Sequence, residues 1–258
     1  TTSLSSDDVK IAASLAHVES SIFIASKLAT LVNISGDAWG PNVGSKLSSV
    51  TLSHSATTFM GAYEVPSAGD WSIHRGGAVM IENAEKSVID GCKFDQVNLY
   101  AKEETSRRDF ASEESIMYNH PLGLLRPHSL SPPPQVGGNG VTVSKYARDV
   151  VISNNEIVRI GDSGILVVGD LKYETATPWD HSVDGAYPLN TTVSGNLIHE
   201  LGLFTKQTAG FFQALAANTS VIGNIVLNGP RSALNFNDAA FGGNDISRNL
   251  LANVVRET

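Results

Sequence analysis

TSVIGNIVLNG, residues 219–229, is one of four segments that align with one another without gaps and decide the fold. The other three are VVISNNEIVRI (150–160), TTVSGNLIHEL (191–201) and NDISRNLLANV (244–254). Each contains β-branched residues, then a small or polar residue, an asparagine and further apolar residues; the shared asparagines are Asn155, Asn196, Asn224 and Asn249. A fifth copy, KSVIDGCKFDQV (86–97), has Cys92 in this asparagine slot. The chain therefore contains an internal repeat.

The spacing of the slots predicts the length of one repeat. Consecutive slots lie 63, 41, 28 and 25 residues apart. Leaving out the proline-rich, charged stretch 98–136 and most of 171–188 reduces the two long spacings to about 25 residues. A second short strand pattern precedes each copy, as in SGILVVGD (163–170). This pattern predicts an all-β, right-handed parallel β-helix, a solenoid of about 25-residue coils with a ladder of asparagines.

The repeated asparagines have a structural interpretation. If they face inward at one corner of each coil, they hydrogen-bond backbone groups of their own and the next coil. Cys92 is expected to be a buried small residue in the same row. The two insertions are expected to leave the solenoid at turns and to stand beside one of its faces.

The repeat also defines the domain organisation. Residues 1–50 are less regular and are expected to form an N-terminal cap or the first irregular coils. Residues 51–258 are expected to form the β-helix, interrupted by insertions at about 98–136 and 171–188.

Composition excludes several classes of protein. The net charge is −8 and no basic run occurs, which argues against a nucleic-acid partner. The single cysteine cannot form an intrachain disulfide, and no apolar run approaches the ~20 residues of a membrane span. No metal-ligand spacing or phosphate-binding loop occurs, so neither a metal nor a cofactor is expected. The sequons at Asn33, Asn190 and Asn218 are candidate glycosylation sites and permit secretion.

Several longer stretches resemble right-handed parallel β-helix proteins of the pectate-lyase-like superfamily, and a poorly characterised subgroup in particular. The residues that carry the resemblance are GDWSIHRGGAVMIENAE (69–85), GGNGVTVSKYARDV (137–150), IGDSGI (160–165), NLIHELGLFTKQTAGFFQA (196–214), NGPRSALNFNDAAFGG (228–243) and NVVRET (253–258). The resemblance implies extracellular carbohydrate chemistry, by lyases, hydrolases or epimerases, and also includes inert adhesins. Such relatives usually continue past Arg-Glu-Thr, so the chain is expected to lack its final coils and cap.

The stretch LNFND (234–238) is the first candidate for a binding surface. Leu234 and Phe236 have the alternating spacing of a half-buried strand, which sends Asn235 and Asn237 to the opposite face, with Asp238 at the exit. On the same face we expect an amide and further donors from the preceding coil, which would offer hydrogen bonds to sugar hydroxyls: Gln213, Lys206 and Gln207. The alternative is an exposed polar ladder in which Asp238 only caps the following turn.

Two arginines are the second candidate. Arg231 and Arg256 lie seven residues past the asparagines of adjacent coils, so they are expected to stack. Like charges repel unless an anion lies between them, and either an acidic sugar or an ordinary bridge to Asp238 or Glu257 would supply it.

Acid–base chemistry has several candidates in the same region. A hydrolase needs two converging carboxyl groups, for which we consider Asp238, Glu257, Asp162 and Glu200. A lyase needs a cation beside a uronate carboxylate and a base, for which we consider Arg231, Arg256, Lys206 and His199. The sequence does not choose between these reactions. It predicts a secreted or cell-surface protein that acts on a polysaccharide or glycan through a groove on the last coils, or alternatively a non-catalytic structural or adhesive glycoprotein.

Overall fold

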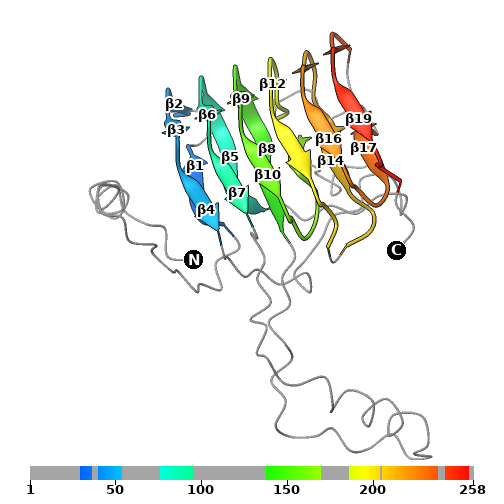
Figure 1. Ribbon diagram of the computed structural model, residues 1–258. Coiled ribbons are helices and arrows are strands. Elements are labelled where there is room, and N and C mark those ends of the chain that lie inside the picture. The colour runs from blue at the N-terminus through cyan, green and yellow to red at the C-terminus, as the bar shows by residue number, and fades with distance from the viewer. Residues whose placement is uncertain are drawn as a thin grey trace, which may run out of the picture.

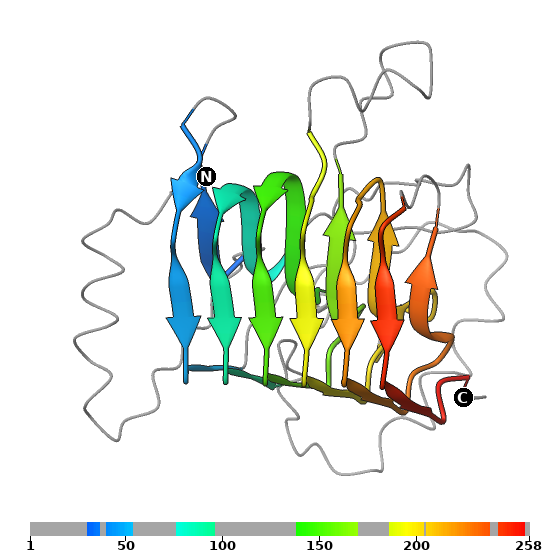
Figure 2. The ribbon, with the colours of Figure 1, turned by 90° about the horizontal axis from the view of Figure 1, so that it is seen from above.

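The computed structural model describes residues 30–36, 40–53, 76–95, 138–169, 186–203, 205–237 and 242–255. All strands in these ranges pair in parallel and form three sheets that run the length of a solenoid (Figure 1). The predicted all-β parallel β-helix is therefore confirmed. Seen from above, the strands of one sheet follow one another in chain order from the N-terminal to the C-terminal end (Figure 2).

Each coil contributes one strand to each sheet, except that the first coil contributes both β1 and β2 to one of them, and we name the sheets A, B and C in the order in which a coil visits them. Sheet A contains β1 (Val32–Ser35), β2 (Asn42–Val43), β5 (Gly77–Glu85), β8 (Asn139–Arg148), β11 (Ile165–Val168), β14 (Ala209–Ala214) and β17 (Ser232–Phe236). Sheet B contains β3 (Lys46–Ser48), β6 (Val88–Asp90), β9 (Val151–Ser153), β12 (Thr192–Ser194), β15 (Ser220–Ile222) and β18 (Asp245–Ser247). Sheet C contains β4 (Thr51–Ser53), β7 (Lys93–Asp95), β10 (Glu156–Val158), β13 (Leu197–His199), β16 (Ile225–Leu227) and β19 (Leu250–Ala252).

The described residues therefore make six coils. The first, β1 to β4, includes residues 30–36 and 40–50 of the segment where a cap or irregular coils are expected, and its strands already pair with those of coil 2. The insertion at 98–136 lies outside the described residues, as does most of the insertion at 171–188.

The strands of sheets B and C are three residues long, and only the middle residue points inward. In sheet B the middle residues include Ile89, Ile152, Val193 and Val221, all fully buried. In sheet C they include Phe94, Ile157, Ile198 and Val226, which are at most 1% exposed. Because side chains alternate along a strand, the first and third residues of each strand form the outer faces of these sheets.

The corner between sheets B and C holds the asparagine ladder. The residue before each slot has a left-handed backbone, with φ of 55° at Asn154, 63° at Gly195 and 66° at Gly223. This turn directs the following asparagine side chain into the solenoid, where Asn155, Asn196 and Asn224 are at most 2% exposed.

The ladder repeats one hydrogen-bond pattern from coil to coil. The backbone N–H and the Nδ2 of Asn155 both donate to Oδ1 of Asn196, at 3.0 and 2.9 Å. Asn196 donates in the same way to Asn224, at 3.0 and 2.9 Å. Each Nδ2 also donates backwards to a carbonyl of the previous coil, as Asn196 does to Ile152 O at 3.0 Å. The predicted ladder is confirmed, and it satisfies the buried polar groups of the turn.

Cys92 occupies the asparagine slot of coil 2, buried as expected. Its N–H donates to Asn155 Oδ1 at 2.9 Å, and its Sγ lies 3.6 Å from Leu47 O, where the ladder amides of later coils place Nδ2.

We expect Cys92→Asn to raise the free energy of unfolding by about 1–2 kcal/mol, because the new amide can donate to Leu47 O and accept a hydrogen bond from the Val50 N–H. Urea denaturation measures the change, with Cys92→Ala as the control. A midpoint below that of the alanine variant would contradict the account of this slot.

Candidate functional site

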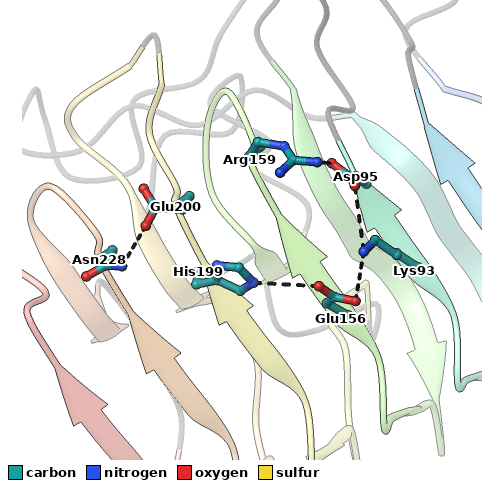
Figure 3. Close-up of polar contacts among 7 residues, drawn as sticks. All are labelled: Lys93, Asp95, Glu156, Arg159, His199, Glu200 and Asn228. Carbon is teal, nitrogen blue, oxygen red and sulfur yellow. Dashed lines mark hydrogen bonds and ion pairs between the residues drawn. The ribbon is translucent and has the colours of Figure 1, made fainter.

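The outer face of sheet C carries a cluster of five ionisable side chains, which we call the charged cluster (Figure 3): Lys93, Asp95, Glu156, Arg159 and His199. The parallel register places Lys93 beside Glu156, and Asp95 and His199 on either side of Val158. These residues come from three consecutive coils. They lie together because they follow the slot of their coil by one, three or four positions.

Two carboxylates meet around one ammonium in the charged cluster. Lys93 Nζ lies 3.1 Å from Glu156 Oε2 and 3.7 Å from Asp95 Oδ2. Asp95 also pairs with the guanidinium of Arg159. Oε2 of Glu156 and Oδ2 of Asp95 therefore cannot be farther apart than the two Lys93 contacts laid end to end.

His199 extends the cluster to coil 4. Its Nε2 lies 3.8 Å from Glu156 Oε1, and it is the one histidine in the described part of the chain. The side chains of His199 and Glu156 are 25% and 39% exposed, so a ligand can reach both. Histidine and carboxylate side chains are the usual proton donors and acceptors in catalysis, and this pair is accessible from solvent.

Only some of the residues predicted from the sequence lie at this face. His199 belongs to the charged cluster, whereas the neighbouring Glu200 accepts a hydrogen bond from Asn228 Nδ2 at 2.6 Å (Figure 3).

The other predicted residues lie elsewhere in the solenoid. Lys206 and Gln207 lie in the turn before β14, where Lys206 Nζ donates to Gly202 O at 3.0 Å. Arg231 directly precedes β17, and Asp162 is buried at the corner between sheets C and A. The remaining candidates lie outside the described residues: Asp238, Arg256 and Glu257.

The prediction that Gln213 lies on the same face as Asn235 and Asn237 is wrong. Gln213 is fully buried, and its Nε2 donates to Ala216 O at 2.9 Å and to Asn244 Oδ1 at 3.3 Å. It pairs in register with Phe236, which packs on the core, so it faces the interior and not the side of Asn235. Asn235 pairs with Phe212 and lies on the outer face of sheet A, opposite Leu234 and Phe236 as expected.

The outer face of sheet A is mainly apolar in coils 4 and 5. Leu166, Val168, Phe212 and Ala214 form a second hydrophobic cluster, separate from the core, and each is at most 1% exposed. On this face Asn235 and Asn237 therefore follow buried apolar side chains of the preceding coils and do not extend a row of amides. The described strands of sheet A do not provide the continuous polar floor that the sequence predicted.

Sequence reasoning missed Lys93, Asp95, Glu156 and Arg159. The signal was present, because KFD (93–95) and NEIVR (155–159) occupy the same offsets from the slot as NLIH (196–199). Residues one and three positions past a slot face outward on adjacent strands of sheet C. Counting one and three residues past each slot brings Glu156, Asp95 and His199 together.

The three sequons differ in structure. Asn33 is exposed on β1, and its Nδ2 donates to Ser35 Oγ at 3.2 Å. Asn190 and Asn218 occupy the corner between sheets A and B with positive φ of 59° and 55°. There they form an outer ladder, in which Asn218 Nδ2 donates to Asn190 Oδ1 at 2.5 Å and Asn190 Nδ2 donates to Asp149 Oδ1 at 3.0 Å. These two amides therefore have a structural role on the surface.

A second polar group lies where sheet A meets sheet B. The guanidinium of Arg148 lies 4.1 Å from the ring centre of Tyr146 and 5.3 Å from that of Tyr187, within the range of cation–π contacts. Tyr146 donates its hydroxyl to Glu85 Oε1 at 2.8 Å. This hydrogen bond to a carboxylate is the main reason that the pKa of Tyr146 is raised above its usual 10.0, since ionised tyrosine would lose the bond and repel Glu85.

The raised pKa of Tyr146 predicts a loss of stability in alkali. A group with a raised folded-state pKa stabilises the fold fully below its unfolded pKa, near 10, and loses that contribution as pH rises through the folded value. We expect Glu85→Gln to return the ionisation of Tyr146 toward pH 10 in an ultraviolet titration that is compared with Tyr146→Phe. An unchanged titration in Glu85→Gln would show that Glu85 is not the cause.

The outer face of sheet B offers a carboxylate of a different kind. Asp90 accepts hydrogen bonds from Ser153 Oγ at 2.7 Å and from Asn154 Nδ2 at 2.9 Å. These two bonds lower the pKa of Asp90. Asp90 is therefore ionised near neutral pH and does not suit the role of a proton donor.

The described residues contain neither a group of metal ligands nor a membrane-spanning helix. Within the described ranges, no three or more His, Cys, Asp or Glu side chains gather in a way that could hold a metal ion. None of the described residues belongs to a helix with the length and hydropathy that crossing a bilayer requires.

The fold defines the chain as a parallel β-helix protein, and comparisons with known proteins give no narrower class. No protein-family model matches it, and no curated protein matches it significantly. A structure from Parabacteroides merdae ATCC 43184, provisionally named a glycosyl hydrolase, aligns over 81% of this chain and 75% of its own with 11% identity and a TM-score of 0.39. A structure named glycoside hydrolase aligns over 89% of this chain and 51% of its own, with 13% identity and a TM-score of 0.33.

An alginate lyase from Paenibacillus sp. str. FPU-7 gives a similar result. It aligns over 85% of this chain and 78% of its own, with 11% identity and a TM-score of 0.33. Similarity at this level does not identify a function.

Proposed function

We propose that this chain is an extracellular carbohydrate-active β-helix protein that hydrolyses a polysaccharide at the charged cluster. The observation that carries the proposal is the convergence of Asp95 and Glu156 on the single ammonium of Lys93, at 3.7 and 3.1 Å. Glycoside hydrolysis requires two carboxyl groups that flank the scissile bond. Retaining enzymes hold them about 5–5.5 Å apart and inverting enzymes about 6.5–9.5 Å apart, so the shared contact with Lys93 favours the retaining spacing.

The surroundings of the two carboxylates suggest different roles for them. Asp95 contacts both Arg159 and Lys93, which suits the carboxylate that attacks or stabilises the developing positive charge of the sugar. Glu156 lies between Lys93 and His199, a group that can exchange a proton, which suits the acid and base role. Lys93 then acts as a positioning residue, because its single ammonium contacts both.

The location of the cluster supports a polymeric substrate. It lies on a lateral face at coils 2 to 4, and further strands of sheet C continue on both sides. Strands follow one another at about 4.8 Å, so a chain of sugars can lie along several coils and be cut within its length. The alternation of cationic and anionic side chains along this face offers donors and acceptors to sugar hydroxyls.

A non-catalytic structural or adhesive role is the second candidate, and one observation favours it. Both carboxylates of the charged cluster already have cationic partners, Lys93 and Arg159 for Asp95 and Lys93 for Glu156. Ion pairs across neighbouring strands stabilise a sheet without any ligand, and exposed pairs of this kind are common. In that case the face would carry no activity.

Product chemistry distinguishes these functions. The protein is incubated with a panel of neutral and uronate polysaccharides, while reducing ends and the ultraviolet absorbance of unsaturated sugars are followed together. We expect reducing ends to increase without unsaturated product. An increase in both signals would replace the hydrolase with a lyase, and silence across the panel from a folded protein would favour the structural role.

A further inference from the structure

The outer face of sheet C changes from polar to apolar along the solenoid. In coils 1 to 3 all but one of its outward positions carry polar side chains: Thr51, Ser53, Lys93, Asp95 and Glu156. In coils 4 to 6 all but one carry apolar side chains, which we call the apolar strip: Leu197, Ile225, Leu227, Leu250 and Ala252. The exception in coils 4 to 6 is His199, a member of the charged cluster.

The apolar strip is exposed to solvent. Ile225 and Leu250 are 38% and 58% exposed, and Leu197 and Leu227 are half-buried. The outward positions of sheet B in the same coils are polar apart from Ile222: Thr192, Ser194, Ser220, Asp245 and Ser247. The fold therefore does not require apolar side chains at outward positions. A contiguous exposed apolar surface with polar surroundings is typical of a binding site.

The apolar strip begins where the charged cluster ends. In the parallel register Leu197 lies beside Glu156, and Leu227 lies beside His199. His199 itself contacts Glu156 from the neighbouring strand (Figure 3). Strands of a sheet lie about 4.8 Å apart, so the strip spans about 10 Å from β13 to β19. A polymer that is cut within its length extends on both sides of the charged cluster, and it therefore also contacts the apolar strip.

The side chains of the apolar strip decide which sugars can lie on it. None of the five offers a hydrogen-bond donor, an acceptor or an aromatic ring. The backbone groups of β13 and β16 are engaged, because each of these strands pairs with a neighbour on both sides. A sugar hydroxyl on the strip would lose its hydrogen bonds to water without replacement, which is unfavourable. A methyl group is favourable there, because its contact with the strip removes apolar surface from water.

We propose that the substrate is a polysaccharide whose sugars carry acetyl esters, and that the apolar strip binds the methyl groups of these esters beside the cleavage site. An acetyl ester suits this position because it replaces a hydroxyl donor with a methyl group, while the polymer keeps other hydroxyls for the charged cluster. The inference rests on the proposed function, since it places further sugars of the same substrate on the same face of sheet C. A polysaccharide without esters is expected to bind less tightly.

A second copy of this chain suits the apolar strip less well. Only the first and third residues of each strand face outward, so the strip is two side chains, or about 7 Å, wide. Polar side chains border it at the corner with sheet A, where Glu200 accepts a hydrogen bond from Asn228. A stable protein interface buries about 800 Å² on each partner, far more than a strip of about 7 by 10 Å provides. The strip has the width of a single chain of sugars.

Acetylated oligosaccharides of xylan, glucomannan and alginate test the inference, each compared with the same sample after mild alkali has removed its esters. Calorimetric titration measures binding, and product analysis measures cleavage separately. We expect at least one acetylated sample to bind at least about tenfold more tightly than its alkali-treated form. We expect Ile225→Thr to reduce this preference below about threefold. The matched control is Ile222→Thr, which changes the same side chain on the outer face of sheet B and is expected to leave the preference unchanged.

Binding and cleavage give separate outcomes. Equal affinity for the acetylated and alkali-treated forms, or no binding of any acetylated sample, would overturn the inference even if the protein cleaves another polysaccharide. An acetyl preference that is lost in Ile225→Thr but comes without cleavage would support the inference and contradict the proposed hydrolysis. A sedimentation mass of twice the single chain that Ile225→Thr reduces to one chain would assign the apolar strip to a second copy. Thermal unfolding shows that both threonine variants remain folded.

Discussion

Replacing Asn196 by alanine is expected to lower the free energy of unfolding by about 3–5 kcal/mol, the largest stability effect of any single substitution considered. The side chain donates to Ile152 O and Asn224 Oδ1 and accepts from the N–H and Nδ2 of Asn155. Alanine would leave buried donors of Asn155 without an acceptor, each at a cost of about 1–3 kcal/mol. Equilibrium denaturation in urea measures the loss.

The outer ladder, which contains Asn218 and Asn190, provides the matched control. Asn218 also donates an amide hydrogen bond to an asparagine of the neighbouring coil, but it is exposed at its corner. Asn218→Gly keeps the left-handed backbone available and is expected to change stability by less than about 1 kcal/mol. If the two variants unfold at the same urea concentration, burial is not what makes the inner ladder important.

Replacing Glu156 by glutamine is expected to reduce kcat/KM on the polysaccharide substrate at least about 100-fold, because the amide cannot donate and accept the proton that the glycosidic oxygen requires. Asp95→Asn is expected to cause a loss of similar size by removing the charge that faces the sugar. Initial rates of reducing-end release, measured over a range of substrate concentrations, separate kcat from KM. Circular dichroism and Tm show that the variants remain folded.

Glu82→Gln is the matched control for Glu156→Gln. Glu82 is also a glutamate paired with a lysine, Lys145, at 3.3 Å, but it lies on sheet A. A general effect of breaking a surface ion pair would appear in both variants, whereas a catalytic role requires that only Glu156→Gln lose activity. Retention of full activity in Glu156→Gln would remove Glu156 from the mechanism.

The fold could be predicted from the sequence because the asparagine ladder places the same type of residue at the same position of successive coils. A buried turn that uses the same amide in four of the six described coils leaves an asparagine at a fixed place, and Asn155, Asn196, Asn224 and Asn249 were sufficient to define the coil. Cys92 was assigned to the same slot because the residues around it follow the repeat, although a buried thiol replaces the amide there. The long spacings were explained because insertions can leave a solenoid only at its turns.

The placement of Gln213 failed for a physical reason. The alternation of side chains in a strand identifies the inner face only when the outer face is polar. In AGFFQA (209–214) both faces are apolar, because Phe211 packs in the core and Phe212 in the outer cluster of sheet A. The sequence could not show which phenylalanine points inward, and the position of Gln213 depends on that choice.

The charged cluster was missed because it depends on contacts between coils that are far apart in sequence. Lys93 and Glu156 lie 63 positions apart, like the slots they follow, and an insertion separates them. Aligning coils on the slot recovers this contact, but only at the offsets of one and three residues. Seven residues past the slot, where Arg231 lies, the chain has already left sheet C for the next turn.

The most direct measurement of the central claim is a crystal structure of the Glu156→Gln variant with an oligosaccharide from the polysaccharide that the wild-type protein degrades or binds. The substitution is expected to slow turnover and leave the sugar in place. We predict that a glycosidic oxygen lies within hydrogen-bond distance of residue 156 and that the adjoining sugar carbon faces Asp95, on the outer face of sheet C. An oligosaccharide bound on sheet A, with the charged cluster unoccupied and its ion pairs intact, would contradict the account.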